Sequence, residues 1–163
     1  MTVDTFIDIY NASLNKRGEE LCGDKVKYQK TGTKTTVVLS DGLGSGVKAN
    51  ILATLTTEIL ITMLNADVPL KEVLKTVIGT LPICRVRKIA YSTFTILWVD
   101  SQTNHFKVIN FDNPPPVYCH NGHVVPLEMQ TQEILGRKIQ SAEGQLERGD
   151  FLGAISDGVL YAG

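Results

Sequence analysis

The sequence has 163 residues, of which 43% are hydrophobic and 20% are charged. This length and composition favour a single globular domain, spanning residues 1–163, with its own apolar core. Sixteen basic and seventeen acidic residues give a net charge of −1. The chain therefore lacks the basic excess typical of proteins that bind nucleic acid or an anionic membrane surface.

A cytoplasmic setting is expected from three further features. Residues 1–4 lack the basic start and apolar centre of a signal peptide. The most apolar stretch, residues 51–64, is interrupted by four threonines and a glutamate. It is shorter than the ~20 residues of a membrane span, so no membrane segment is predicted. The three cysteines, an odd number without a Cys-x-x-Cys pair, favour a reducing compartment.

The first third of the chain predicts three strands followed by a helix. β-Branched and aromatic residues predict a strand over residues 3–14. Residues 26–29 and 35–39 flank a Lys-Thr-Gly-Thr turn and predict a β-hairpin. Apolar residues then recur at helical spacing over residues 47–64. The side chains that this spacing places on one face of the helix are Ile51, Leu52, Leu55, Ile59 and Met63.

A second helix and a series of hairpins complete the prediction. Pro69 opens a helix over residues 70–81. Asn121-Gly122 indicates a hairpin tip, and prolines 114–116 indicate a loop. Strands are predicted over residues 92–99, 105–111, 117–119, 124–125, 137–141 and 151–155. This order predicts an α+β fold with antiparallel sheet.

The glycine-rich segment Gly42-Leu43-Gly44-Ser45-Gly46 fits neither common nucleotide-binding pattern. The dinucleotide fingerprint G-x-G-x-x-G requires glycine at position 47, which is Val47, and the phosphate-loop pattern with its Gly-Lys-Ser/Thr ending is absent from the sequence. The segment instead follows Asp41 at the end of a predicted strand. There the Asp41 carboxylate and the Gly42 carbonyl can face a hard cation, with glycine leaving room for the metal to approach the backbone.

Two more aspartates extend this pattern. Ser156-Asp157-Gly158 repeats the Ser-Asp-Gly sequence at the end of a second predicted strand, and Asp24 precedes the first hairpin arm. A simple Asp-Gly turn would explain any one of them alone. Together, and without a neighbouring histidine, they predict an oxygen-only site for Mn²⁺ or Mg²⁺.

These motifs resemble those of the PPM (type 2C) metal-dependent protein phosphatase superfamily, in its bacterial stage-II-sporulation-E-like branch. Asp41-Gly42-Leu43-Gly44-Ser45-Gly46, followed by Ala49, resembles the D-G-x-G-x-G-x-x-A signature. Gly149-Asp150, followed by Ser156-Asp157-Gly158-Val159, is similar to the late G-D-x-x-x-x-x-S-D-G-V motif, and Gly23-Asp24 matches the early G-D. The resemblance covers nearly the whole chain from Gly23 onward.

The resemblance implies an αββα sandwich, in which helices flank two antiparallel sheets, and a site for two divalent ions. By the match, Asp41 bridges both ions, the Gly42 carbonyl binds one, Asp24 supports that same ion, and Asp157 binds the other. Water held between the ions attacks the phosphorus of phosphoserine or phosphothreonine, and the metal ions and these aspartates carry the catalysis. The expected substrate is a phosphoprotein, such as an anti-sigma-factor antagonist or a similar regulator in bacterial signalling.

The sequence departs from the family pattern after Ser-Asp-Gly, where a further aspartate is expected. Asp112-Asn113 precedes that motif and is in the wrong order to replace it. We therefore expect a C-terminally incomplete domain with one weakened metal position, and an exposed sheet edge through which two copies can pair. The alternative to an enzyme is a catalytically impaired, phosphatase-like module that binds a partner.

Three weaker candidates have simpler interpretations. Zinc at Cys119-His120-Asn121-Gly122-His123 competes with a hairpin tip. Phosphate binding by the basic run at residues 85–88 competes with a solvated loop. Ser45 is expected to cap the helix that follows it.

Overall fold

The computed structural model describes residues 5–81 and 92–161. The strands are β1 (Asp24–Thr31), β2 (Lys34–Gly42), β3 (Ser92–Asp100), β4 (His105–Phe111), β5 (Val117–His120), β6 (His123–Val125), β7 (Gln130–Ile134), β8 (Arg137–Gln145) and β9 (Phe151–Gly153). The helices are α1 (Gly46–Asn65), α2 (Leu70–Thr80) and α3 (Asp157–Leu160). All strand pairs are antiparallel, which confirms the predicted fold class.

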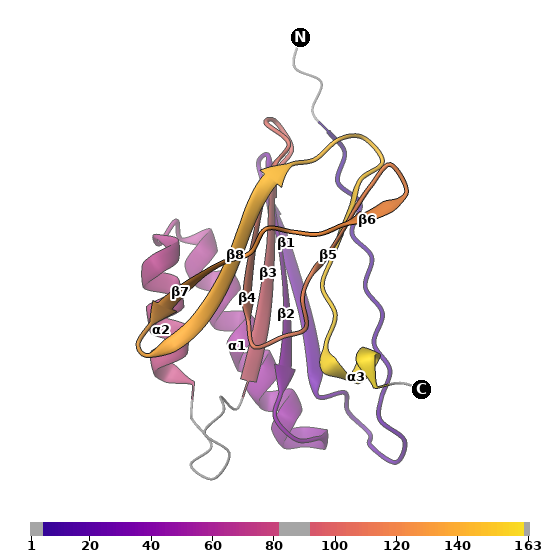
Figure 1. The fold of residues 1–163 in the computed structure, drawn as a ribbon. Helices are drawn as coiled ribbons and strands as arrows, with labels where there is room; N and C mark the ends of the chain where they lie inside the picture. Colours follow the sequence, from indigo (N-terminus) through magenta and orange to yellow (C-terminus); the bar gives the residue numbers. More distant parts are fainter. Residues whose placement is uncertain (1–4, 82–91, 162–163) are drawn as a thin grey trace.

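Two sheets form the centre of the molecule. The larger has the strand order β1-β2-β3-β4-β8-β7 and the smaller has the order β6-β5-β9. Helices α1 and α2 lie together on one side of the large sheet, and β5, β6 and the chain around α3 lie on its other side (Figure 1). The arrangement matches the sandwich of antiparallel sheets and helices that the family resemblance implies.

Alternation along each strand divides the apolar residues between two cores. One core lies between the helices and the large sheet and includes Val38, Phe94 and Ile109. The other lies on the opposite face of the same sheet, where buried Leu97, Val99, Phe106 and Val108 meet partly buried residues of the small sheet and of the chain around it. The large sheet is therefore covered on both faces.

Helix α1 buries a different face from the one predicted. Ile51 and Leu55 are 59% and 46% exposed, although Ile59 and Met63 do pack against the core. The buried face consists mainly of small side chains, namely Gly46, Ala49, Ala53, Thr56, Thr57, Leu60 and Ile61. Small residues face the sheet because the first turn of the helix lies very close to β2. The prediction for α2 is confirmed, since Val73, Leu74, Val77 and Ile78 are all buried.

Helix α1 resembles a membrane span in length and composition, although the sequence predicts no membrane segment. It has 20 residues with a mean hydropathy of 1.4, which is long and apolar enough to cross a membrane by composition alone. A third of the window is buried inside this fold, and the helix packs on the sheet through its small residues. A core helix satisfies the same length and hydropathy test.

The strand predicted over residues 3–14 is wrong for its described part, residues 5–14, which have no regular secondary structure. Thr5 N donates to Ser101 O at 3.1 Å, and Lys30 Nζ donates to Ile7 O at 2.7 Å. The latter contact places the segment beside β1, but it uses a side chain and not a backbone ladder. Phe6 and Tyr10, which suggested the strand, are 80% and 88% exposed.

Strand β7 was not predicted. Its sequence is Gln-Thr-Gln-Glu-Ile, and only Ile134 is buried. It pairs with β8 at the edge of the large sheet. This edge strand has four polar residues and one face in solvent. Its sequence therefore shows almost no alternation of apolar and polar residues, which is the pattern that predicts a strand.

Candidate metal centre

The β1–β2 hairpin places Asp24 directly opposite Asp41. Directly opposed residues in an antiparallel pair project their side chains on the same face, with Cβ atoms about 5 Å apart. A two-residue turn at Gly32-Thr33, with Gly32 at φ +59°, fixes this register. Both aspartates are half-buried, so the hairpin brings two of the predicted metal ligands together.

Asp157, at the other end of the sequence, is the first residue of α3. The preceding Ser156 is buried, and its Oγ donates to Asp24 Oδ2 at 2.5 Å. This bond joins residues 132 positions apart. It holds the start of α3 beside the start of β1, which lies next to the end of β2 (Figure 1). The sequence analysis did not assign a role to this serine, although its place in Ser-Asp-Gly was visible.

The electrostatics show that Asp24 and Asp157 act on Asp41. Burial raises the pKa of Asp41 to about 8, and hydrogen bonding with Asp157 together with the negative charges of Asp24 and Asp157 adds to the increase. The ion pairs seen among the described residues, such as Lys27–Glu58 and Arg137–Asp112, include none of the three carboxylates. The site therefore carries a concentration of negative charge that a bound cation would neutralise.

The carboxylates form an open site. Within residues 5–81 and 92–161, no three His, Cys, Asp or Glu side chains converge as a ready-made metal cage. The donor set is nevertheless that of a hard divalent ion, because it consists of carboxylate and carbonyl oxygens alone. On this chemistry the residues fit Mg²⁺ or Mn²⁺.

Gly42 is required by packing, a reason that differs from the one inferred from sequence. A Cβ at this position would lie 2.0 Å from the backbone oxygen of Ala49 in the first turn of α1. The Gly42 N–H donates to Gly23 O at 3.0 Å. The glycine therefore allows the helix to approach the strand directly behind Asp41, and the space beside its Cα is filled by the helix.

Ser45 occupies the N-cap position of α1 but makes no side-chain capping bond. Its Oγ donates to Glu19 Oε1 at 2.8 Å. The prediction of a side-chain cap is therefore wrong, and the hydroxyl instead ties the glycine-rich turn to the chain before β1.

A buried hydroxyl network supports the end of β2. Ser40 Oγ lies 2.7 Å from Ser92 Oγ and also donates to Thr93 O at 2.7 Å. Thr56 Oγ1 of α1 donates to Ser92 Oγ at 3.0 Å. On the opposite face of the sheet, the Thr93 hydroxyl donates to Asn113 Oδ1. These bonds join the strand that carries Asp41 to β3, and they join β3 in turn to α1 and to the loop after β4.

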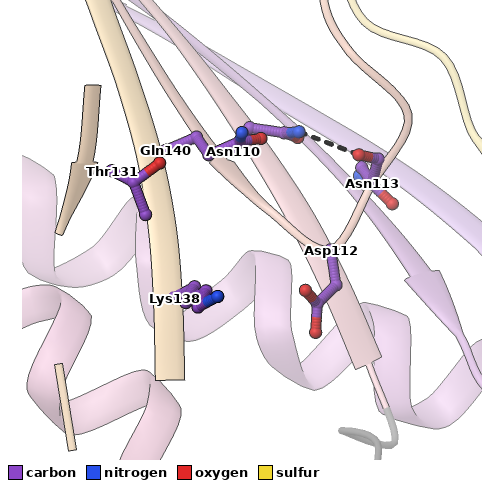
Figure 2. Close-up of a pocket in the computed structure, with 6 residues that line it drawn as sticks. All are labelled: Asn110, Asp112, Asn113, Thr131, Lys138 and Gln140. Atoms are coloured by element: carbon purple, nitrogen blue, oxygen red, sulfur yellow. Dashed lines mark hydrogen bonds between the residues drawn. The ribbon is translucent and has the colours of Figure 1, made fainter. Parts of the chain in front are cut away.

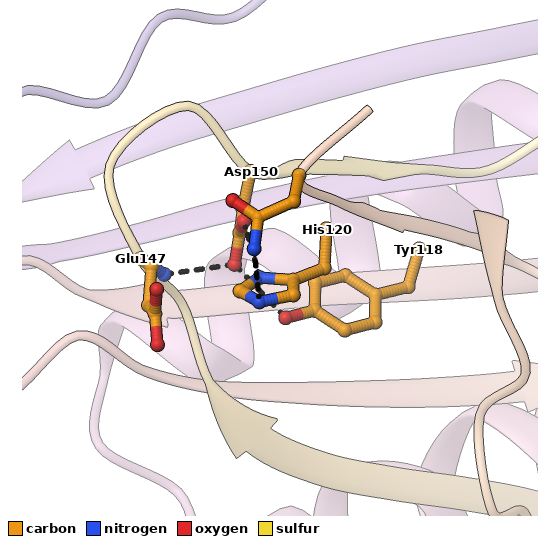
Figure 3. Close-up of polar contacts among 5 residues, drawn as sticks. Tyr118, His120, Glu147 and Asp150 are labelled. Carbon is orange, nitrogen blue, oxygen red and sulfur yellow. Dashed lines mark hydrogen bonds and ion pairs between the residues drawn. The ribbon is translucent and has the colours of Figure 1, made fainter. Parts of the chain in front are cut away.

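A second polar cluster surrounds Asp150 of the late motif (Figure 3). Tyr118 donates its hydroxyl proton to Asp150 Oδ2 at 2.9 Å, His120 Nδ1 lies 2.9 Å from Oδ1, and the Glu147 N–H donates to Oδ2 at 2.8 Å. The Asp150 side chain is 2% exposed. The cluster fastens the loop before β9 to β5, and β9 in turn leads to Ser156 and Asp157.

The protonation of this cluster follows from its hydrogen bonds. Burial alone would raise the pKa of Asp150, but the bonds from Glu147, Tyr118 and His120 outweigh it and lower the pKa. Burial, followed by the bond to the Asp150 carboxylate, raises the pKa of Tyr118 to about 12. The ionised aspartate and neutral tyrosine therefore form a stable structural pair.

The weaker sequence candidates are resolved only in part. Asn121 and Gly122 form the turn between β5 and β6, both with positive φ, which confirms the hairpin. The residues of the proposed zinc site are not part of any group of three or more metal-ligating side chains in the described chain. The basic run at residues 85–88 lies outside the described residues.

Comparisons with known proteins agree with this architecture. A family sequence model described as Stage II sporulation protein E (SpoIIE) matches residues 31–162. Stage II sporulation protein E of Bacillus subtilis (strain 168) is 25% identical over 149 residues, which cover 89% of this chain and 18% of that protein.

Two solved structures are similar. The PP2C phosphatase domain of SpoIIE from Bacillus subtilis, solved with a fragment of its regulatory domain, has a TM-score of 0.77 at 25% identity and matches 91% of this chain and 45% of that one. RsbX in complex with magnesium has the same fold, with a TM-score of 0.64 at 21% identity over 84% of this chain and 67% of that chain. The chain thus spans less than half the length of either Bacillus subtilis match.

Proposed function

The chain belongs to the stage II sporulation protein E family, and from that membership we propose that it is a metal-dependent phosphatase domain acting on phosphoserine or phosphothreonine in proteins. The single observation that carries the proposal is that Asp24 and Asp157 lie close to Asp41, whose pKa is raised to about 8 first by burial and then by these two neighbouring carboxylates. Half-buried carboxylates gathered in this way are typical of a site that binds a divalent ion.

Each residue of the site has a proposed part. Asp41 and Asp157 bind the divalent ions, and Asp24 supports the ion beside the Gly42 carbonyl. Ser156 orients Asp24 by donating to its Oδ2. When bound, Mg²⁺ or Mn²⁺ supplies a lowered water pKa and neutralises charge on the phosphoryl oxygens. The chain itself holds Asp24 and Asp41 at the ends of paired strands and Asp157 at the start of α3, so that they are positioned before substrate arrives.

The alternative, a phosphatase-like module that binds a partner without turnover, is favoured by one observation. The described ligands form no closed metal group, and an open site binds a divalent ion weakly. We propose the enzyme as the primary function. Its setting is cytoplasmic bacterial signalling, its substrate is a small phosphorylated regulator such as an anti-sigma-factor antagonist, and pairing of two copies through a sheet edge is a further possibility to be measured.

The test combines metal binding with turnover. Calorimetric titration with Mn²⁺ and Mg²⁺ should show binding to the chain and loss of that binding in Asp41→Asn. A matched control is Asp67→Asn, because Asp67 is an exposed aspartate with φ +55°, a conformation that asparagine also adopts readily.

Turnover separates the two functions. Mn²⁺-dependent release of phosphate from p-nitrophenyl phosphate or a phosphoserine peptide supports the enzyme, whereas metal and phosphopeptide binding without release supports the binding module. Unchanged metal affinity in Asp41→Asn would refute the site itself.

A further inference from the structure

A polar pocket lies on the large sheet (Figure 2). It has a volume of about 450 Å³ and is lined by Asn110, Asp112, Asn113, Thr131, Lys138 and Gln140. These residues come from the end of β4, the loop after it, and strands β7 and β8. Apart from Asp112, every lining residue is neutral or basic, so the pocket suits a polar ligand.

The floor of the pocket is preorganised. Asn110 Oδ1 accepts a bond from Thr95 Oγ1 at 2.7 Å, and its Nδ2 donates to Asn113 O at 2.8 Å. Asn113 Nδ2 donates to Thr95 Oγ1 at 3.0 Å. Both asparagines are buried, and their polar atoms are engaged in these bonds. The floor is therefore a fixed surface, and a ligand would be recognised mainly by the exposed rim.

The rim offers one available positive charge. Asp112 is paired with Arg137, whose Nη2 lies 3.4 Å from Asp112 Oδ2. Lys138 is exposed and makes no hydrogen bond or ion pair with any residue of the described chain. Gln140 and Thr131 are paired across β8 and β7 and add neutral hydrogen-bonding groups beside it. Glu133 lies opposite Lys138 across β7 and β8, but no ion pair joins the two among the described residues, so the ammonium group of Lys138 is the cation that a ligand meets.

The pocket faces the same side of the sheet as Asp41. Asp41 pairs with Thr93, Thr95 pairs with Asn110, and Asn110 pairs with Gln140. Because residues two apart on a strand share a face, this chain of pairs places Asp41, Asn110 and Gln140 on one face, and Lys138 with them. The hydrogen bonds through Thr93, Asn113 and Thr95 connect the two sites along that face.

The separation suits a short stretch of peptide. Three strand spacings lie between β2 and β8, which at ~4.8 Å each amount to about 14 Å. An extended chain advances about 3.5 Å per residue, so about four residues span that distance. A peptide whose phosphoserine reaches Asp41 therefore places a side chain about four residues away in the pocket.

We propose that this pocket is a specificity subsite that takes an acidic side chain, aspartate or glutamate, about four residues from the phosphorylated serine or threonine. The inference rests on the proposed phosphatase function. The carboxylate binds Lys138 and accepts hydrogen bonds from Gln140 and Thr131. The subsite selects among phosphoproteins and takes no part in the chemistry.

The experiment measures binding and turnover separately. Two sets of labelled phosphoserine peptides carry glutamate or alanine at the fourth position before or after the phosphoserine, and their affinities for the full chain with Mg²⁺ are measured by fluorescence anisotropy. Glutamate in one of the two directions should improve affinity by about three- to five-fold at low salt, the size expected for one exposed ion pair. Lys138→Ala should remove this preference, and Lys138→Glu should reverse it.

The control variant is Lys71→Ala, since Lys71 is an exposed lysine on α2, in the helix layer on the other face of the sheet. It should keep the glutamate preference. A preference that survives in Lys138→Ala, or its absence from the unaltered chain, would overturn the subsite. Stronger binding of a second phosphoserine than of glutamate, or competition by inorganic phosphate that depends on Lys138, would instead assign the pocket to phosphate.

Turnover of p-nitrophenyl phosphate distinguishes this inference from the proposed function. That substrate is too small to reach the pocket, so Lys138→Ala should leave its kcat/KM unchanged while raising KM for the glutamate peptide. Loss of p-nitrophenyl phosphate turnover in Lys138→Ala would contradict the subsite. Absence of all turnover by the unaltered chain would contradict the phosphatase function, while the anisotropy measurements would still decide whether the pocket binds a carboxylate.

Discussion

Replacing Gly42 with alanine tests the close approach between β2 and α1. The added Cβ would lie 2.0 Å from Ala49 O, 2.6 Å from Ala49 C and 2.8 Å from Ala49 Cα, whereas real Cβ atoms almost never approach closer than 3.0 Å. The helix or the strand must therefore move by at least 1.0 Å. Overpacking of this kind in a core costs about 1–3 kcal/mol, and the backbone partner cannot rotate away as a side chain can. We expect Gly42→Ala to reduce the free energy of unfolding by about 3 kcal/mol.

A double-mutant cycle identifies the contact. A Cβ at Gly23 would meet the Ala49 side chain, with Cβ atoms 3.1 Å apart. Ala49→Gly should therefore relieve Gly23→Ala, and it should not relieve Gly42→Ala because that clash is with backbone atoms. Gly79→Ala is the control, since its new Cβ would make only a 3.4 Å contact with Leu135 Cδ1. Alanine within α2 should stabilise the protein by about 0.5–1 kcal/mol.

The measurement is urea denaturation followed by circular dichroism, with the midpoint and slope fitted for each variant. A Gly42→Ala protein within about 0.5 kcal/mol of the unaltered chain would refute the reasoning, as would full rescue by Ala49→Gly. Metal titration of the same variant adds a functional measurement. Displacement of β2 or α1 by 1 Å next to Asp41 should weaken Mn²⁺ binding, even under conditions where the variant remains folded.

Three further predictions concern the carboxylates. Ser156→Ala should weaken Mn²⁺ affinity and lower the free energy of unfolding by about 1.5–3 kcal/mol, the usual value for a hydrogen bond to a charged group. Calorimetry measures the affinity and urea denaturation measures the stability. An unchanged affinity and an unchanged stability would contradict a positioning role of Ser156 through Asp24. Because the folded-state pKa of Asp150 is lowered, its ionised form contributes stability above the unfolded pKa of about 3.9 that is lost as pH falls through the folded value. Asp150→Asn should therefore flatten the fall in unfolding free energy between pH 7 and pH 3, and an unchanged slope would contradict the assignment. In EDTA at pH 8, Asp41→Asn should raise the melting temperature because it removes a negative charge beside Asp24 and Asp157. Mg²⁺ should then stabilise the variant less than the unaltered chain. A lower melting temperature of the variant in EDTA would contradict repulsion among these carboxylates.

The sequence predicts the architecture well where apolar periodicity is strong. Strand β4 and the buried face of α2 agree with the pattern, and the Asn121-Gly122 turn lies at the tip of its hairpin. The pattern fails at the surface. Residues 5–14 resemble a strand in composition but lack a backbone ladder, and β7 forms a ladder with almost no apolar residues. Pairing at an edge depends on the neighbouring strand, which a local pattern does not contain.

The candidate site was predicted residue by residue, but its supporting contacts were not. Asp24 and Asp41 follow from a hairpin register that a Gly32 turn determines, so their pairing can be derived locally. The bond from Ser156 to Asp24 joins residues 132 positions apart. It depends on the way the small sheet packs against the large one, and no spacing within the sequence encodes it.

The two Ser-Asp-Gly motifs illustrate this limit, because identical sequences have different roles. In the first motif, Ser40 lies within β2, where successive side chains point to opposite faces of the sheet. The Ser40 hydroxyl therefore points to the helix side and contacts Ser92, while Asp41 lies on the other face. In the second motif, Ser156 is the residue before α3 and its hydroxyl reaches Asp24. One serine therefore holds the strand that carries a proposed ligand, and the other bonds to a proposed ligand directly. The same substitution, serine to alanine, should accordingly affect mainly stability at position 40 and both metal affinity and stability at position 156.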